Sequence, residues 1–229
     1  MISKLPRWVL IGGGALAFIA GIINAVGFLS VYRQGITHLT GTTTLLGISV
    51  AEGNLAVSLH LLAFIGSFLA GAIASGFIIQ DSTLSLGRRY GVALMLESLL
   101  LFLAVPFLHR GYFAGDCLAS CACGLQNAMV STYSGAVLRT THVSGVFTDI
   151  GIFIGHWLRR LPVDFRRLRL WLVLIFSFGA GGTVGAASFA RLAYGTLYLP
   201  AALTGLTGLA YGIYRHKLRA KNQPAISLE

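Results

Sequence analysis

The sequence contains very little acidic charge, with only seven Asp and Glu residues in a chain of 229. Charged residues of all kinds make up 10%, against about 25% in ordinary soluble domains. Hydrophobic residues make up 55%. So few charges exclude an ordinary water-soluble surface, and the composition predicts an integral membrane protein whose partner is the lipid bilayer.

The basic residues exceed the acidic ones, which gives a net charge of +10. Such an excess can indicate nucleic-acid binding, but here the basic residues do not form a stripe interleaved with aromatic residues. They cluster between apolar runs and in a tail at 215–229, which is the positive-inside pattern of multi-pass membrane proteins. We therefore expect no nucleic-acid partner and an inner (plasma) membrane location, with both termini and the basic tail in the cytoplasm.

Cysteine is scarce, and all three cysteines lie close together at Cys117, Cys121 and Cys123. Thiolates at such spacing could hold copper(I) or zinc. Cysteine also packs as a small hydrophobic residue, and no pair of histidines stands beside this cluster. We therefore expect no metal site and no cofactor.

Eight apolar segments follow one another along the chain. They run approximately over residues 8–30, 39–51, 55–79, 90–107, 112–132, 140–158, 168–190 and 197–214. A bilayer core needs about 20 helical residues, and six segments reach or approach that length. The segments at 39–51 and 140–158 begin with polar residues, so they are expected to be half-helices or re-entrant segments. The predicted fold is an all-α polytopic membrane protein with six spanning helices and two such segments.

Short stretches of the first half recur in the second half. Residues 21–25, 37–41 and 44–47 correspond to residues 124–128, 141–145 and 148–151, at offsets of 103 and 104 residues. Internal duplication of this length is typical of transporter folds. The sequence thus predicts a single integral membrane domain over 1–229, with a first repeat at 8–107 and a second at 112–214.

The distribution of Lys and Arg distinguishes two topologies. The six-span topology leaves 14 of the 17 basic residues in the cytoplasm and gives the halves opposite orientations, as an inverted repeat. The alternative, eight spanning helices with a parallel repeat, leaves 12 of them there. Both obey the positive-inside rule, and the six-span topology obeys it better.

The duplicated motifs also carry a resemblance to a known family. In the first half they read Gly21-x-x-Asn24-Ala25 and Leu39-Thr40-Gly41-Thr42-x-x-x-Leu46-Gly47. In the second half they read Gly124-x-Gln126-Asn127-Ala128, Arg139-Thr140-Thr141, Ser144-Gly145 and Thr148-Asp149. Over nearly its whole length the chain resembles the YoaK-type family of uncharacterised bacterial inner-membrane proteins (domain of unknown function 1275). It departs from the family pattern at Asn24, usually Asp, and at Thr42, usually Asn. The resemblance implies the fold and the membrane location, and no activity.

A half-helix that starts near the middle of the bilayer presents free N–H groups and about half a positive charge. Two such starts would suit a small anionic or polar solute, so we expect a secondary transporter. The candidate substrate-binding residues of the first half are Asn24, His38, Thr40, Gly41 and Thr42. Those of the second half are Gln126, Asn127, Thr141, His142, Ser144 and Gly145. The chain is short for a complete transporter, which suggests a homodimer.

Two acidic residues are candidates for proton coupling, Asp149 in the second half-helix and Glu97 in the middle of an apolar segment. Asp149 could instead pair with Arg139 or His142. The other site residues also have structural alternatives: Thr and Ser cap helices, and Asn holds helices together. The alternatives to a transporter are a channel or a non-transporting scaffold. We expect no enzyme, because the sequence lacks a nucleophile elbow, zinc-ligand spacing and a phosphate-binding loop.

Overall fold

The computed structural model describes residues 7–31, 33–79, 89–134 and 139–222. Over these ranges the chain forms eight α-helices and one short 3₁₀-helix. They are α1 (Arg7–Leu29), α2 (Thr40–Ala51), α3 (Leu55–Ile78), α4 (Arg89–His109), α5 (Phe113–Ser134), α6 (Val143–Leu158), α7 (Phe165–Leu192), η1 (Ala193–Leu197) and α8 (Tyr198–Asn222). Each α-helix covers one of the apolar segments, so the predicted order of helices is confirmed. The predicted tail at 215–229 lies partly outside the described residues.

The helices fall into two length classes. Six have 21 to 28 residues, whereas α2 has 12 and α6 has 16. At 1.5 Å per residue, α2 is about 18 Å long and α6 about 24 Å. Both are shorter than a hydrocarbon core of about 30 Å.

Four stretches of the described chain are long and apolar enough to cross a membrane. They are Leu10–Leu29, Leu55–Ile78, Arg89–His109 and Phe165–Tyr214, the last of which includes α7, η1 and much of α8. Helix α5 has the length but carries more polar residues. It packs against α3, α4 and α1, so its polar side chains face other helices. The protein is a helical membrane protein.

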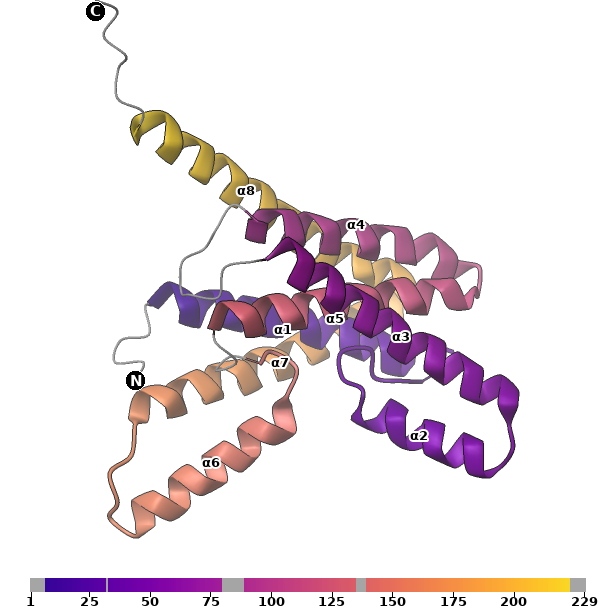
Figure 1. The fold of residues 1–229 in the computed structure, drawn as a ribbon, viewed down its shortest axis with the longest axis horizontal. Helices are drawn as coiled ribbons and strands as arrows, with labels where there is room; N and C mark the ends of the chain where they lie inside the picture. Colours follow the sequence, from indigo (N-terminus) through magenta and orange to yellow (C-terminus); the bar gives the residue numbers. More distant parts are fainter. Residues whose placement is uncertain (1–6, 32, 80–88, 135–138, 223–229) are drawn as a thin grey trace, which may run out of the picture.

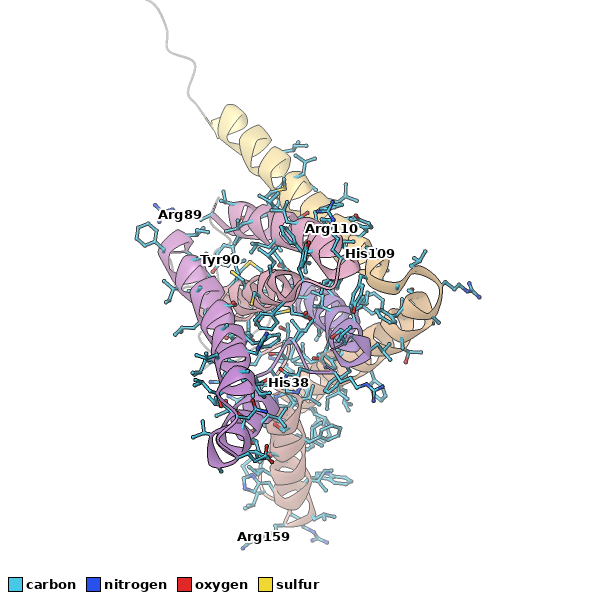
Figure 2. All side chains as sticks on the ribbon, turned by 90° about the vertical axis from the view of Figure 1, so that its right-hand side faces the viewer. His38, Arg89, Tyr90, His109, Arg110 and Arg159 are labelled. Atoms are coloured by element: carbon cyan, nitrogen blue, oxygen red, sulfur yellow. The ribbon has the colours of Figure 1, made fainter. Side chains whose placement is uncertain are left out.

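The outer faces of the helices are strongly apolar. On α3 alone, the exposed large hydrophobic residues are Leu55, Val57, Leu59, Leu62, Leu69, Ile73 and Phe77. Figure 2 shows side chains projecting outward all round the bundle. A water-soluble monomer rarely exposes apolar surface on this scale, and lipid is the solvent that fits it.

The six long helices lie roughly parallel to one axis (Figure 1). Each long helix of the first half runs opposite to its counterpart in the second half, namely α1 to α5, α3 to α7 and α4 to α8. Helices α1, α4 and α7 run from the left end of the bundle to the right end, and α3, α5 and α8 run back. The starts of α4 and α7 and the end of α6 therefore lie at the left, and the ends of α1 and α4 at the right.

The two halves interlock through helices that are distant in sequence. Helix α1 packs along α7, α5 packs along α3, and α4 packs along both α5 and α8. Four glycines allow the closest approaches, since an added Cβ would overlap the backbone of the facing helix. The pairs are Gly21 with Phe178, Gly181 with Phe18, Gly124 with Phe68, and Gly71 with Cys121. Glycine is required at these positions because two helix backbones meet there.

Candidate functional site

The linker between α1 and α2 folds back and packs tightly against α1. The side-chain Oδ1 of Asn24 on α1 accepts a hydrogen bond from the Thr37 backbone N–H, with an N···O distance of 3.4 Å. Gly35 is packed so tightly that an added Cβ would lie 2.7 Å from Cε1 of His38 and 3.2 Å from Oδ1 of Asn24. His38 is half-buried and lies near the middle of the molecule (Figure 2).

The linker between α5 and α6 is attached in a corresponding way. The hydroxyl of Thr141 donates a hydrogen bond to Oδ1 of Asn127 on α5, at 3.2 Å. Asn24 and Asn127, which correspond in the duplicated motifs, therefore both hold a Thr of the linker that leads into a short helix. These asparagines connect a helix to a linker and do not bridge two helices directly.

The two short helices start without a side-chain cap. Helix α2 is preceded by Leu39 and α6 by His142, and neither side chain caps the helix. The first helical hydrogen bonds run from Thr43 N–H to the Leu39 carbonyl, at 2.8 Å, and from Val146 N–H to the His142 carbonyl, at 3.1 Å. The hydroxyls of Thr44 and Thr148 instead bond to carbonyls one turn earlier. Helix capping therefore does not explain the polar residues at these starts.

In each short helix, the first three N–H groups have no acceptor within the described part of the chain. They belong to residues 40–42 in α2 and to residues 143–145 in α6. In the view of Figure 1, both helices begin toward the middle of the molecule and run outward in different directions. The positive ends of both helix dipoles are thus on the side that faces the middle of the molecule, and a helix start of this kind can stabilise negative charge.

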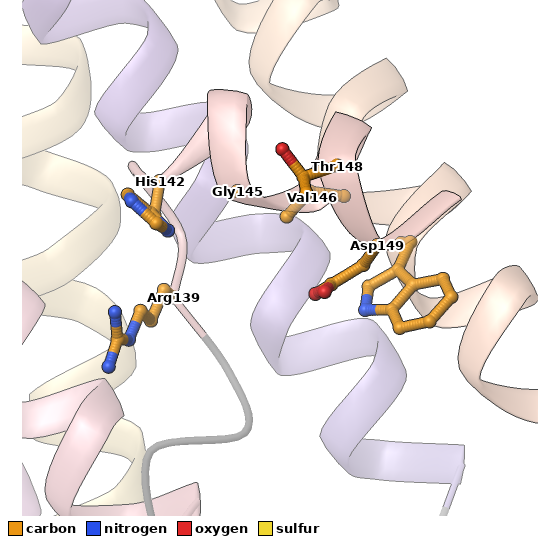
Figure 3. Close-up of a pocket in the computed structure, with 7 residues that line it drawn as sticks. Arg139, His142, Gly145, Val146, Thr148 and Asp149 are labelled. Carbon is orange, nitrogen blue, oxygen red and sulfur yellow. The ribbon is translucent and has the colours of Figure 1, made fainter. Parts of the chain in front are cut away.

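A cavity of about 430 Å³ lies at the start of α6 (Figure 3). Its lining residues are Arg139, His142, Gly145, Val146, Thr148, Asp149 and Trp171. His142, Gly145 and Asp149 are predicted site residues that the structure brings together here. Arg139 and His142 lie on one side of the cavity and Asp149 on the other (Figure 3).

The charged groups of this cavity are unpaired within the described residues. Neither Arg139 nor Asp149 has an ion pair or hydrogen bond there, so the structural alternative of a pair between Asp149 and Arg139 or His142 is not realised. Trp171 contacts Phe153 edge to face, with ring centroids 6.4 Å apart and an interplanar angle of 85°. This contact fixes one wall of the cavity.

The corresponding glycines of the two helix starts have different surroundings. A Cβ added to Gly145 would overlap the imidazole ring of His142, whereas one added to Gly41 would meet no atom within 4 Å. Glycine at 145 therefore makes room for His142 beside the helix start. At 41 nothing in the structure requires a glycine.

The remaining predicted site residues divide into buried and exposed groups. Asn24, Thr42, Gln126 and Thr141 are buried, Asn127 is half-buried, and Thr40, Gly41, His142 and Ser144 are exposed. None of the first-half residues lines the described cavity. Arg139 and Trp171 do line it but were absent from the predicted site. Arg139 directly precedes Thr140-Thr141-His142 in the sequence, and a basic residue at that position was the signal that could have placed Arg139 in the site.

Glu97 and Gln126 form a pair in the protein interior. The Gln126 amide donates a hydrogen bond to Oε1 of Glu97 at 2.9 Å. Both side chains are buried, and Oε2 of Glu97 has no hydrogen-bond partner within the described residues. The sequence offered no way to see this pair, because its members lie 29 residues apart on α4 and α5. Gln126 therefore lies with Glu97 and away from the described cavity.

The cysteines pack individually along α5. Cys123 is buried, and Cys117 and Cys121 are half-buried. Among the residues that the structure describes, no group of three His, Cys, Asp or Glu side chains is placed to hold a metal ion.

The fold and these polar junctions define a helical membrane protein with two short helices that begin at polar linkers. Residues 13–210 match the family described as "Protein of unknown function (DUF1275)". The match covers most of the chain, which therefore belongs to this family. No curated protein and no solved structure matches the chain.

Proposed function

We propose that this protein is a secondary transporter for a small anionic or polar solute. The observation that carries the proposal is the cavity at the start of α6, where Arg139, His142 and free helix N–H groups meet. A cation, a helix dipole and unsatisfied donors at one place favour a carboxylate or another anion. The starts of α2 and α6 both point toward the interior (Figure 1), which supports a solute path between two half-helices.

The proposed architecture is an inverted repeat with six spans and two re-entrant half-helices. Its support comes from the opposite directions of α1 and α5, and of α4 and α8 (Figure 1). The reciprocal glycine contacts of α1 with α7 and of α5 with α3 also follow the repeat. Helices that occupy matching places in antiparallel halves are typical of transporters that alternate access between the two sides.

The proposed location is the bacterial inner membrane, with both termini in the cytoplasm. The start of α1 and the end of α8 lie at the same end of the bundle (Figure 1). The basic turn between α6 and α7 belongs to that end as well, and cytoplasmic turns carry the excess of Lys and Arg. A homodimer is part of the same proposal.

Proton coupling is a further element of the proposal. Asp149 lines the cavity, and Glu97 is completely buried with one carboxyl oxygen unpartnered within the described chain. Ionisable groups in the helices of a membrane protein commonly carry protons or ions. No enzymatic activity is proposed.

Transport is tested with the full-length protein in proteoliposomes on a solid-supported membrane. Acetate, succinate, sulfate and phosphate gradients are applied, and the saturable current is measured. At least one anion should give a current that Arg139→Gln reduces by about tenfold or more, since a charge-assisted hydrogen bond is lost. The matched control is Arg110→Gln, which removes the same charge at the turn after α4. If folded protein gives no current with any anion, the transporter proposal is wrong. A large current that does not saturate favours the alternative of a channel.

A further inference from the structure

The cavity at the start of α6 contains one cationic and one anionic side chain that do not neutralise each other. Arg139 and Asp149 both line it, and neither has an ion pair or hydrogen bond within the described residues. Both side chains are exposed, and ionisable residues in the membrane-embedded part of a helical protein mark candidate functional sites. A purely anionic solute would satisfy Arg139 and would leave Asp149 without a partner.

The order of groups along α6 matches a ligand with two opposite charges. The free N–H groups of residues 143–145 attract negative charge. Asp149 follows Gly145 by four residues, which is about one helical turn, or roughly 6 Å along the axis. A carboxylate bound at the helix start would therefore leave an adjoining positive group within reach of Asp149. The indole of Trp171 also lines the cavity and can attract a cation.

We infer that this cavity binds an amino acid as a zwitterion, and this inference rests on the proposed transport function. The carboxylate is held by Arg139 and the free N–H groups of α6. The ammonium group is held by Asp149 and Trp171. The cavity volume of about 430 Å³ lies within the range of about 300–1,000 Å³ for small-molecule sites, which leaves room for an amino-acid side chain.

The first half does not offer a second site of this kind. At the offset of 104 that aligns residues 37–41 with 141–145, Arg139 corresponds to Gly35 and Asp149 to Leu45. Gly35 is packed against His38 and Asn24. The inference therefore assigns one zwitterion site to each chain.

The test compares three ligands that share a phenyl group and differ only in charge. L-Phenylalanine carries both charges, 3-phenylpropionate only the carboxylate, and phenethylamine only the ammonium group. Their dissociation constants are measured with the full-length protein in lipid nanodiscs, and the same series is repeated with L-alanine, propionate and ethylamine. In at least one series the amino acid should bind about tenfold tighter than either partner.

Variants then identify which residue recognises which charge. Asp149→Asn should abolish the preference for the amino acid over the carboxylate, and Arg139→Gln the preference over the amine. Asp164→Asn and Arg110→Gln are the matched controls, because they make the same changes outside the cavity. Asn at 164 can still accept the hydrogen bond from Arg166 N–H that Asp164 accepts at the start of α7.

Each outcome bears on the inference separately from transport. If the carboxylate binds as tightly as the amino acid and Asp149→Asn changes nothing, the zwitterion inference is overturned, while the proposal of an anion transporter stands. If no ligand of either series binds, the inference is also overturned, and the anion currents decide the transport proposal independently.

Discussion

The two linkers that lead into the short helices are built alike and differ in what they enclose. In both, an asparagine on the preceding long helix holds a threonine of the linker, and the short helix begins without a side-chain cap. In the first half the linker has Gly35 at the position that corresponds to Arg139, and Gly35 is packed tightly against His38. In the second half a cavity is present, and it is lined by Arg139 and Asp149, whose side chains are exposed.

This difference separates the features that both halves share from the residues that we propose to recognise a ligand. If the halves arose by the proposed duplication, the features that they share reflect the requirements of the fold. The charges occur in only one copy, at positions where the other copy has Gly35 and Leu45. Function is therefore better sought where the halves differ than where they agree.

The largest expected effect is a difference in cysteine labelling, which reports the side of the membrane on which each short helix ends. Glu52 ends α2 and Arg159 ends α6. In an inverted repeat, a reporter cysteine at Glu52 is outside and one at Arg159 is inside. An impermeant thiol reagent applied to intact cells should then label Glu52→Cys fully and Arg159→Cys not at all.

The reporters are introduced into a variant that lacks the three native cysteines. Gly195→Cys, in the turn between α7 and α8, is the positive control because it is outside in both topologies. Protection of both Glu52→Cys and Arg159→Cys would mean that the short helices cross the membrane and that the repeat is parallel.

The next largest expected effect is a loss of stability, and it tests the close helix contacts at glycine that both halves form. Gly124→Val should destabilise the protein by about 3 kcal/mol or more, because the new side chain overlaps the Phe68 carbonyl across the contact between α5 and α3. Gly21→Val should cost a similar amount where α1 meets α7. The melting temperature in detergent measures both. Gly66→Val is the matched control, since a Cβ there meets no atom within 4 Å. Equal melting temperatures for Gly66→Val and Gly124→Val would contradict the packing described.

Much of the fold could be read from the sequence because long apolar runs separated by polar turns have few other stable arrangements. The eight helices lie where the apolar segments predicted them, and the short, polar-starting segments form the short helices. The repeat motifs also identified His142, Gly145 and Asp149, which line one cavity. These predictions succeeded because they depend only on runs of apolar residues and on short motifs that are local in the sequence.

The unpredicted features depend on which helix faces meet. Nothing local connects Glu97 with Gln126, and nothing local brings Trp171 on α7 beside the start of α6. Hydrophobic periodicity is weak in helices that are apolar all round, so it does not reveal their partners. The sequence also suggested helix capping as an alternative for Thr40 and Ser144. The structure excludes it, because both lie within the first turn and neither acts as the cap.

The smallest effect tests the difference between the halves at one pair of glycines. Gly41→Ala should raise stability by about 0.5–1 kcal/mol, since it adds helix propensity where a Cβ meets nothing. Gly145→Ala gains the same propensity but displaces the His142 ring. Its net effect should therefore be near zero or negative, as measured by the melting temperature in detergent.

A double-mutant cycle shows whether His142 causes this difference. In the background of His142→Ala the ring is absent, so Gly145→Ala should become as favourable as Gly41→Ala is in the unmodified protein. The interaction free energy between positions 142 and 145 would then be about 0.5–1 kcal/mol or more. An interaction free energy of zero would mean that the His142 ring does not pack over the start of α6. The glycine at 145 would then have no more structural reason than the one at 41, and the two helix starts would differ only in their charges.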